Sequence, residues 1–186
     1  MIYIDDHIWD FDLNEALNQV CPSRRDYALR YRQERDRRLS VVAYLLLQKA
    51  LRLEYGIEEL PEFSRNANGK PLLKGYPDIH FSLSHCHEVV ACVLSDKLVG
   101  VDIETLDQYD EEVARRVMND NEMSQILTSS SPAVTFTRLW TMKESFFKMT
   151  GGPLNGDVAD ILDLATSCHF TTIHHPAYIL TTCTTK

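Results

Sequence analysis

The chain has 186 residues, and its 19 Lys and Arg against 27 Asp and Glu give a formal net charge of −8 with neutral histidines. A content of 44% hydrophobic and 25% charged residues is typical of a soluble globular protein. This composition excludes collagen-like, coiled-coil and disordered chains. The length allows one domain or two fused small lobes.

Neither a membrane span nor a secretory signal is predicted. The longest apolar runs, at residues 41–47 and 89–94, are far shorter than the roughly 20 residues of a membrane-spanning helix. Residues 1–6, MIYIDD, have neither a basic nor an apolar signal region. We therefore expect a cytoplasmic protein. Its five cysteines form no C-x-x-C pair, so we expect reduced, packed thiols and no zinc knuckle.

The first half of the chain combines a basic segment, a helix and short strands. Residues 24–38 hold seven arginines against three acidic residues, and residues 39–55 have apolar side chains at helical spacing before Gly56. Turn-forming residues follow at 66–71. Strands are expected at 79–83, 89–94 and 98–104. Because only residues 95–97 separate the last two, we expect these two to form a hairpin.

The second half is acidic at first and Thr-rich at its end. Eight carboxylates lie between Asp102 and Glu122. The expected elements are a helix at 109–127, a turn at 129–132, a helix at 133–149 ended by Gly151-Gly152, and antiparallel strands ending at 178–183. This order indicates an α+β fold. The separation of basic and acidic regions suits a site for phosphates and a cation, although two solvated helical faces would look the same.

Two carboxylates share one face of the expected strand at 98–104. Strand periodicity directs Val99, Val101 and Ile103 to one face, and Gly100, Asp102 and Glu104 to the other. Adjacent carboxylates repel each other unless a cation lies between them, so Mg²⁺ is a natural ligand. A half-exposed strand with an acidic face remains the simpler interpretation of this pattern alone.

The helix at 133–149 carries charges where a helix usually carries apolar residues. At about 100° per residue, Lys143 falls inside the apolar arc of Phe136, Trp140 and Phe147, and Glu144 lies at its border. An idle charge there would lose its hydration, so we expect it to have a partner or a function. The alternative is a surface pair of Glu144 with Lys148, four residues further along the helix.

The end of the strand at 79–83 offers a possible phosphate ligand pair. Ser84 and His85 can bind phosphate through a hydroxyl and an imidazole. His85 and His87 could instead belong to a zinc site, but no further ligand is spaced nearby. No Walker A loop, G-x-G-x-x-G turn or G-x-S-x-G elbow is present. Any phosphates must therefore be bound by scattered Arg, Lys and His residues with a metal.

Taken together, these segments resemble the 4′-phosphopantetheinyl transferases, specifically the larger, surfactin-synthetase-activating type. That family is marked by G-[VI]-D-[VI]-E and, some tens of residues later, W-x-x-K-E-[AS]-x-x-K. The matching segments are GVDIE at 100–104 and WTMKESFFK at 140–148, preceded by GKP at 69–71 and FSLSH at 81–85. Four ordered motifs are far more specific than any one of them.

The resemblance implies roles for the matching residues. Asp102, Glu104 and Glu144 would hold Mg²⁺, and Glu144 would also activate the acceptor serine. Lys143 and Lys148 would lie near the pyrophosphate and the reacting centre. The residues implied to bind coenzyme A phosphates are Lys70, Ser84 and His85, with Arg24 and Arg38 expected at the 3′-phosphate.

The implied fold is α+β, with two similar small lobes related by a pseudo-twofold axis and the active site in the cleft between them. The N-terminal lobe, 1–98, would bind the coenzyme A phosphates, and the C-terminal lobe, 99–186, would supply the Mg²⁺ ligands and catalytic carboxylates.

The implied activity is transfer of 4′-phosphopantetheine from coenzyme A to a serine of an apo carrier protein, releasing adenosine 3′,5′-bisphosphate. The acceptor could be a fatty-acid, polyketide or nonribosomal peptide carrier, and a monomer is expected because one chain supplies both lobes. Two alternatives remain: a nucleic-acid-binding module that uses residues 24–38, and a catalytically silent relative that binds carrier proteins.

Overall fold

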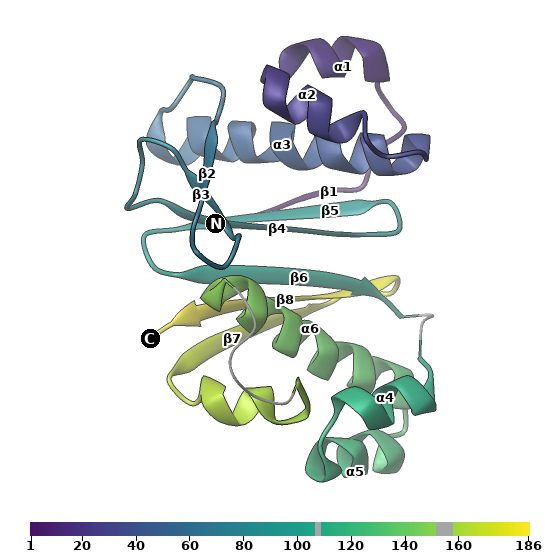
Figure 1. Ribbon diagram of the computed structural model, residues 1–186. Helices are drawn as coiled ribbons and strands as arrows, with labels where there is room; N and C mark the ends of the chain where they lie inside the picture. Colours follow the sequence, from purple (N-terminus) through teal and green to yellow (C-terminus); the bar gives the residue numbers. More distant parts are fainter. Residues whose placement is uncertain (107–108, 152–157) are drawn as a thin grey trace.

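Two antiparallel three-stranded sheets lie one above the other in the middle of the molecule, and helices cover their outer sides (Figure 1). The computed structural model describes residues 1–106, 109–151 and 158–186. The upper sheet has the strand order β1-β5-β4 and the lower sheet the order β6-β8-β7. The result is a mixed α/β arrangement whose two sheets share the centre of the molecule.

The upper part is built around the long helix α3. Its elements are β1 (Ile2–Asp5), α1 (Leu13–Gln19), α2 (Pro22–Ala28), α3 (Glu34–Tyr55), β2 (Phe63–Arg65), β3 (Pro71–Leu73), β4 (His80–Cys86) and β5 (Val89–Ser95). Helix α3 ends at Gly56, whose φ of 66° is a left-handed conformation that glycine adopts without strain. One face of α3 packs on Val90, Cys92 and Leu94 of β5, which forms the upper core.

The lower part is built around the helix α6. Its elements are β6 (Val99–Thr105), α4 (Glu111–Val117), α5 (Asp120–Thr128), α6 (Pro132–Thr150), the 3₁₀ helix η1 (Val158–Ala165), β7 (Cys168–His174) and β8 (Tyr178–Thr185). The single helix expected at 109–127 is two helices. Asn119 caps α5, accepting from the Glu122 N–H at 2.9 Å, and the Glu122 carboxylate accepts from the Asn119 N–H at 3.0 Å. This capping box starts a new helix instead of continuing the old one.

The predicted hairpin of residues 89–94 with 98–104 is wrong. Strands β5 and β6 belong to different sheets, and β5 pairs with β1 and β4. The hairpin is formed by β4 and β5, with Cys86 opposite Val89 and a turn at His87, whose φ is 41°. The short connection at 96–98 therefore carries the chain from one sheet to the other.

The alternation expected in β6 is confirmed. Val99, Val101 and Ile103 are fully buried between the two sheets, against Ala91 and Val93 of β5. The opposite face of β6 lies against α6, where a Cβ on Gly100 would overlap the Ser145 main-chain oxygen. Glycine thus lets helix and strand approach closely.

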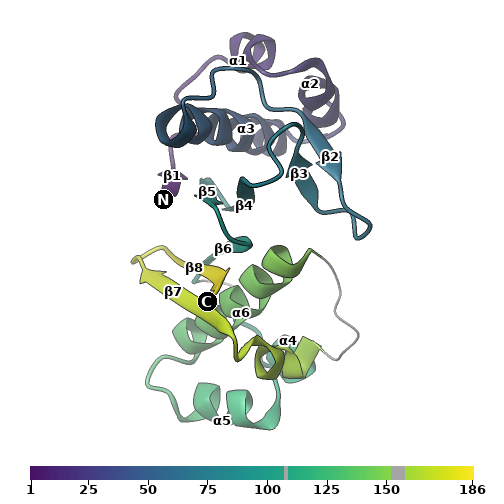
Figure 2. The same ribbon diagram turned by 90° about the vertical axis from the view of Figure 1, so that its left-hand side faces the viewer.

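Both sheets use the same strand order, with the first strand at one edge and the last strand in the middle. In the described residues, three α-helices follow the first strand of each sheet. The upper part then adds the β2–β3 hairpin before β4, and the lower part adds η1 before β7. Figure 2, viewed from the side, shows the hairpin descending from the upper part toward the end of α6. In the described residues, no helix has the length and apolar character needed to cross a membrane.

Candidate active site

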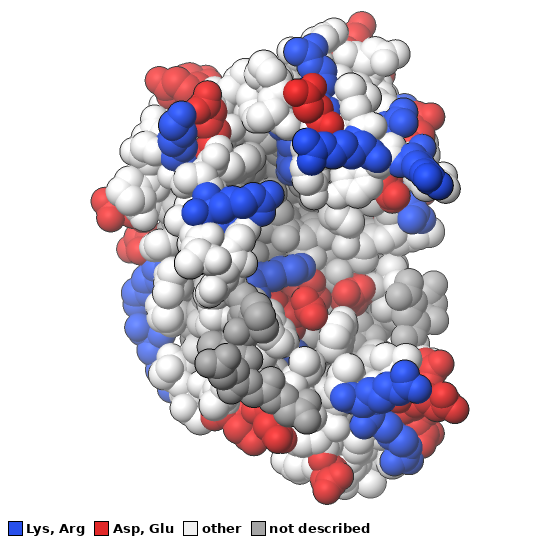
Figure 3. Space-filling view, viewed as in Figure 1, with Lys and Arg blue, Asp and Glu red and all other residues white. Residues whose placement is uncertain are grey.

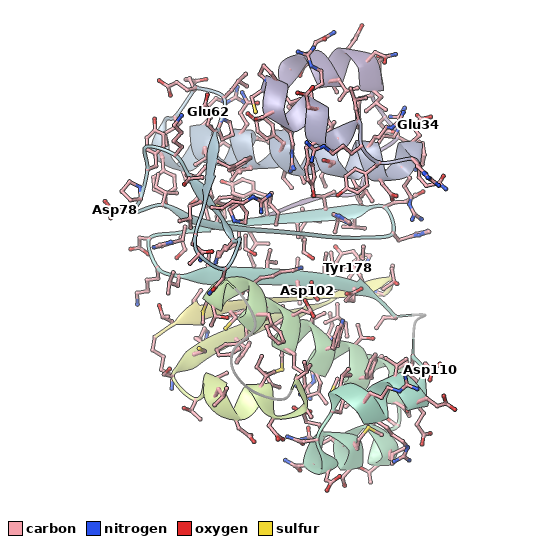
Figure 4. All side chains as sticks on the ribbon, viewed as in Figure 1. Glu34, Glu62, Asp78, Asp102, Asp110 and Tyr178 are labelled. Atoms are coloured by element: carbon pink, nitrogen blue, oxygen red, sulfur yellow. The ribbon has the colours of Figure 1, made fainter. Side chains whose placement is uncertain are left out.

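Three side chains from three elements meet where the two sheets adjoin. Lys148 Nζ of α6 donates to Asp102 Oδ1 of β6 at 2.6 Å and to Ser84 Oγ of β4 at 2.7 Å. The Ser84 hydroxyl donates to the same Asp102 oxygen at 2.9 Å. Asp102 is 2% exposed and lies between the upper and lower parts (Figure 4). In the sequence, Asp102 follows Ser84 by 18 positions and Lys148 follows it by 64, so folding brings distant residues together.

Asp102 keeps one oxygen without a partner. Among the described residues, Asp102 Oδ2 is buried and accepts no hydrogen bond, which is costly for a carboxylate. Burial raises the pKa of Glu104 to about 7, and the Asp102 charge adds to this, while Lys148 and a hydrogen bond from Trp140 oppose it. The pKa of Glu144 is also raised, first by burial and then by Asp102, and Lys148 again lowers it. Glu104 and Glu144 are therefore both affected by the negative charge of Asp102 and by the positive charge of Lys148.

The carboxylates do not form a finished metal cage. Within residues 1–106, 109–151 and 158–186, no three His, Cys, Asp or Glu side chains converge as metal ligands. The free oxygen of Asp102 and the mutual repulsion of the carboxylates nevertheless fit a hard divalent cation, which prefers oxygen ligands.

His85 lies beside this group on β4. Loss of solvent around the ring lowers the pKa of His85, and the Lys148 ammonium lowers it further. Asp36, at the start of α3, and Asp102 act in the opposite direction. The imidazole is therefore affected by charges at the start of α3 and by Asp102, and residue 85 as a whole retains contact with solvent although surrounding atoms partly cover its ring.

Lys70 connects the β2–β3 hairpin to the lower part. Its Nζ donates to the main-chain oxygens of Met149 at 2.9 Å and Val99 at 3.2 Å, and burial lowers the pKa of Lys70 to about 8. Beside it is a cavity of about 330 Å³. The cavity is lined by Asn68, Gly69, Lys70, Pro71, Phe81, Ser82, Leu83, Phe147, Lys148 and Gly151. Both parts of the molecule thus contribute to one cavity next to Lys148.

A second cavity continues this space toward α2. It measures about 420 Å³ and shares Pro71, Phe81 and Leu83 with the first. Arg24 and Arg65 lie in its wall. Figure 3 shows this face of the molecule, with basic and acidic side chains meeting in a hollow at its middle.

The Arg24 guanidinium lies against two aromatic rings. Its guanidinium lies 5.3 Å from the ring centre of Tyr27 and 5.8 Å from that of Tyr44. Burial lowers the pKa of Arg24, and its buried Nε has no hydrogen-bond partner among the described residues. A stacked guanidinium in a cavity wall is suited to an anionic group.

The structure does not bring Arg38 to this space. The Arg38 side chain is only 12% exposed, and its donors bind Glu34 and the main-chain oxygens of Ile8 and Phe11. Its guanidinium also lies 5.0 Å from the rings of Trp9 and Phe11. These contacts use the donors to hold residues 8–11 against α3, so the geometry does not support the expected phosphate contact.

Lys143 is also separate from the Asp102 group. Its side chain is completely buried, as the helical pattern predicted, and its Nζ lies 2.8 Å from Glu122 Oε2. It also donates to the main-chain oxygens of Val158 and Ala159. The expected contact of Lys143 with a pyrophosphate is not supported by this geometry, because all three donors of its ammonium have protein acceptors.

Three contributing residues were missed from the sequence. The sequence predicts Trp140 as an apolar residue and as the first residue of the motif at 140–148, but not its hydrogen bond to Glu104. Ser82 accepts from the Val101 N–H at 3.0 Å and so links β4 to β6. Glu122 could have been noticed from the N-x-x-E pattern at 119–122, which is typical of a capping box, although nothing in that pattern indicates Lys143 as its partner.

Comparison with known families covers nearly the whole chain. Residues 98–186 match the 4′-phosphopantetheinyl transferase superfamily, and residues 9–97 match the 4′-phosphopantetheinyl transferase N-terminal family.

Individual relatives agree with these matches. The 4′-phosphopantetheinyl transferase Sfp of Bacillus subtilis is 28% identical over 157 residues, which cover 83% of this chain and 70% of the relative. The transferase gsp of Aneurinibacillus migulanus is 33% identical over 151 residues, covering 80% and 61%. The L-aminoadipate-semialdehyde dehydrogenase-phosphopantetheinyl transferase of Saccharomyces cerevisiae is 33% identical over 109 residues, covering 53% and 40%. With the motifs and the site in place, these matches show that the chain belongs to the 4′-phosphopantetheinyl transferase superfamily.

Proposed function

We propose that this protein transfers 4′-phosphopantetheine from coenzyme A to a serine hydroxyl of an apo carrier protein. The observation that carries the proposal is the contact of Ser84, Asp102 and Lys148 beside a cavity to which both parts of the chain contribute. Membership of the transferase superfamily agrees with it. A site assembled at such a junction can hold a nucleotide on one side and a protein substrate on the other.

The molecule would act as two lobes, 1–98 and 99–186, related by a pseudo-twofold axis with the active site in the cleft between them. The equal strand order of the two sheets supports this division. A monomer is sufficient, because one chain supplies both walls of the cavity.

Coenzyme A would lie along the two connected cavities. Arg24 would bind the 3′-phosphate, because its stacked guanidinium lies in the wall of the second cavity. Lys148, Ser84 and His85 would bind the pyrophosphate at the other end. Lys70 would shape the wall between them, since its Nζ is used by two main-chain oxygens.

Asp102, Glu104 and Glu144 would hold Mg²⁺, and the free Asp102 oxygen and the raised pKa values of the two glutamates support this. When bound, the ion supplies charge neutralisation for the pyrophosphate.

The reaction needs a base, a leaving group and a positive environment. The serine oxygen forms a bond to the phosphorus that carries the pantetheine arm, and the bond from that phosphorus to the adenosine 3′,5′-bisphosphate breaks. Glu144 accepts the serine proton as the general base. Lys148 stabilises the negative charge of the departing bisphosphate.

The test is mass spectrometry of several apo carrier proteins after incubation with the protein, coenzyme A and Mg²⁺. We expect each accepted carrier to gain one phosphopantetheine group, and a chelator to abolish the gain. Glu144→Gln should lower the rate by about 10²-fold or more. Glu111→Gln, in the exposed pair with Arg115, is the matched control and should retain the rate.

The outcomes separate the alternatives. Coenzyme A binding without transfer to any carrier would indicate a silent relative. Absence of both binding and transfer would contradict the proposed function.

A further inference from the structure

Among the described residues of the lower part, Lys143 carries the most deeply buried charge. It is 0% exposed, and its Nζ contacts Glu122 Oε2 at 2.8 Å, Val158 O at 3.0 Å and Ala159 O at 2.5 Å. A buried charge is tolerated only when it is paired and hydrogen-bonded. Lys143 meets both conditions without any ligand, so its charge is explained by the protein itself.

Glu122 is the residue that makes this burial possible. Glu122 is 5% exposed, and its Oε2 accepts from both Lys143 and the Asn119 N–H. One carboxylate thus connects the beginning of α5 with the middle of α6. Through the two carbonyl contacts of Lys143, the same network includes the start of η1.

The network lies next to the reacting centre along the helix. Lys143 immediately precedes Glu144, and successive residues of a helix differ by about 100° in direction. The contact of Lys143 with Glu122 therefore restrains the rotation of α6 about its axis, and with it the side of the helix from which Glu144 extends. On its other side, α6 contacts β6 at Gly100. Helix α6 is thus contacted by Glu122 on one side and by β6, the strand of Asp102, on the other.

We propose that Glu122 is a positioning residue for the transfer reaction, which acts by holding Lys143 and thereby the segment of α6 that carries Glu144. This role rests on the proposed function of the site. Lys143 is then a structural cation within the motif at 140–148, and its contribution to the rate comes from the placement of Glu144. Displacement of a catalytic group by about 1 Å costs about 10²-fold in rate.

The proposal is tested by steady-state transfer kinetics of Glu122→Gln, Lys143→Met and the double variant. The Gln side chain retains an acceptor for the Asn119 N–H and removes the charge. We expect kcat to fall by about tenfold or more in each variant, with the KM for coenzyme A within about twofold of the wild-type value. The double variant should be no slower than Lys143→Met, because both substitutions remove one interaction.

The double variant also guards against loss of folding. It removes both charges, so no unpaired ion remains in the core, and we expect it to fold even if a single variant does not. Asn119→Ala is the control for a purely structural effect. It removes the side-chain cap but keeps the ion pair, and it should lower the melting temperature while leaving kcat within about twofold.

Two results would overturn the proposal. If Lys143→Met raised the KM for coenzyme A while Glu122→Gln had wild-type kinetics, Lys143 would be a phosphate ligand. If Glu122→Gln lowered only the melting temperature and left kcat unchanged, its role would be stability alone. Absence of transfer by the wild-type protein would instead overturn the proposed function, and the positioning role with it.

Discussion

At the scale of single residues, the site depends on the different environments of the two Asp102 carboxylate oxygens. Oδ1 is used by Lys148 and Ser84, and Oδ2 is buried without a partner among the described residues. The two neighbouring serines of β4 have different functions as a result. Ser84 contacts the charged group, whereas Ser82 accepts from the main chain of β6.

This difference predicts opposite effects of two similar substitutions. Ser84→Ala should lower kcat/KM by about tenfold and change stability little, because it removes a hydroxyl that contacts both charged groups while the direct Lys148–Asp102 pair remains. Ser82→Ala should retain activity but lose about 1 kcal/mol of stability, because the Val101 N–H would lose its acceptor. Transfer kinetics and urea unfolding of both variants measure this, and similar losses of activity in both would contradict it.

Glu104 predicts a pH dependence of stability in metal-free protein. Its folded pKa of about 7 lies above the ordinary value of 4.5, so between these values the folded state binds more protons than the unfolded state. The stabilising contribution is complete below pH 4.5 and is lost as pH rises through 7. After allowance for solvent screening, we expect the free energy of unfolding of the wild-type protein to fall by about 1 kcal/mol between pH 5 and pH 8 because of this group. Glu104→Gln should not show this fall. Urea unfolding with a chelator measures it, and parallel pH curves for wild type and variant would disprove it.

At the scale of elements, the contact of α6 with β6 determines where the site lies. Gly100 is the point of closest approach, since an added Cβ would overlap the Ser145 oxygen and lie 2.5 Å from the Met149 nitrogen. Both are rigid main-chain atoms of α6. The helix can therefore bring Lys148 to Asp102 only if residue 100 has no side chain.

Gly100→Ala should therefore be strongly destabilising, although it adds only one methyl group. We expect a loss of about 3 kcal/mol, because helix and strand must separate, and a loss of transfer activity with it. Gly56→Ala is the matched control. Its φ of 66° is strained for alanine, but the space around it is open, so about 1 kcal/mol is expected. Thermal unfolding of the two variants compares them, and equal losses would contradict the close packing.

At the scale of the whole molecule, the two parts are joined by the lysine of the β2–β3 hairpin as well as by the apolar layer between the sheets. Lys70 Nζ reaches the main chain at the start of β6 and at the end of α6. Gly151, which ends α6 with φ of 84°, lies against the same hairpin near Asn66. The hairpin thus fixes the end of α6 relative to the upper sheet.

Lys70 predicts that this junction responds to alkaline pH. Its folded pKa of about 8 lies below the ordinary 10.5, so the unfolded state binds more protons between these values, and stability due to this group falls as pH decreases from 10.5 through 8. Lys70→Met should remove this dependence, which we expect to be up to about 1 kcal/mol after solvent screening. Urea unfolding at pH 8 and pH 10 measures it, and an unchanged slope in the variant would refute it.

The sequence predicted local features well and contacts between distant elements poorly. Strand alternation was sufficient to separate Asp102 from Val101, and helical periodicity placed Lys143 in the interior. The acceptor of Lys143 could not be predicted, because Glu122 belongs to another helix and only packing brings the two together. The mistaken hairpin has the same origin, since a short connection does not reveal that its strands belong to different sheets.

The meeting of Ser84, Asp102 and Lys148 also has a consequence for how the chain acquires activity during folding. Each of the three lies on a different element, and their separations of 18, 46 and 64 residues make these contacts non-local. Non-local contacts form late, after the loops between them have closed. The first 98 residues can complete their own sheet without Asp102 or Lys148, and no half of the chain contains all three residues. The site of a refolding or newly synthesised chain is therefore complete only after α6 has docked against both β4 and β6.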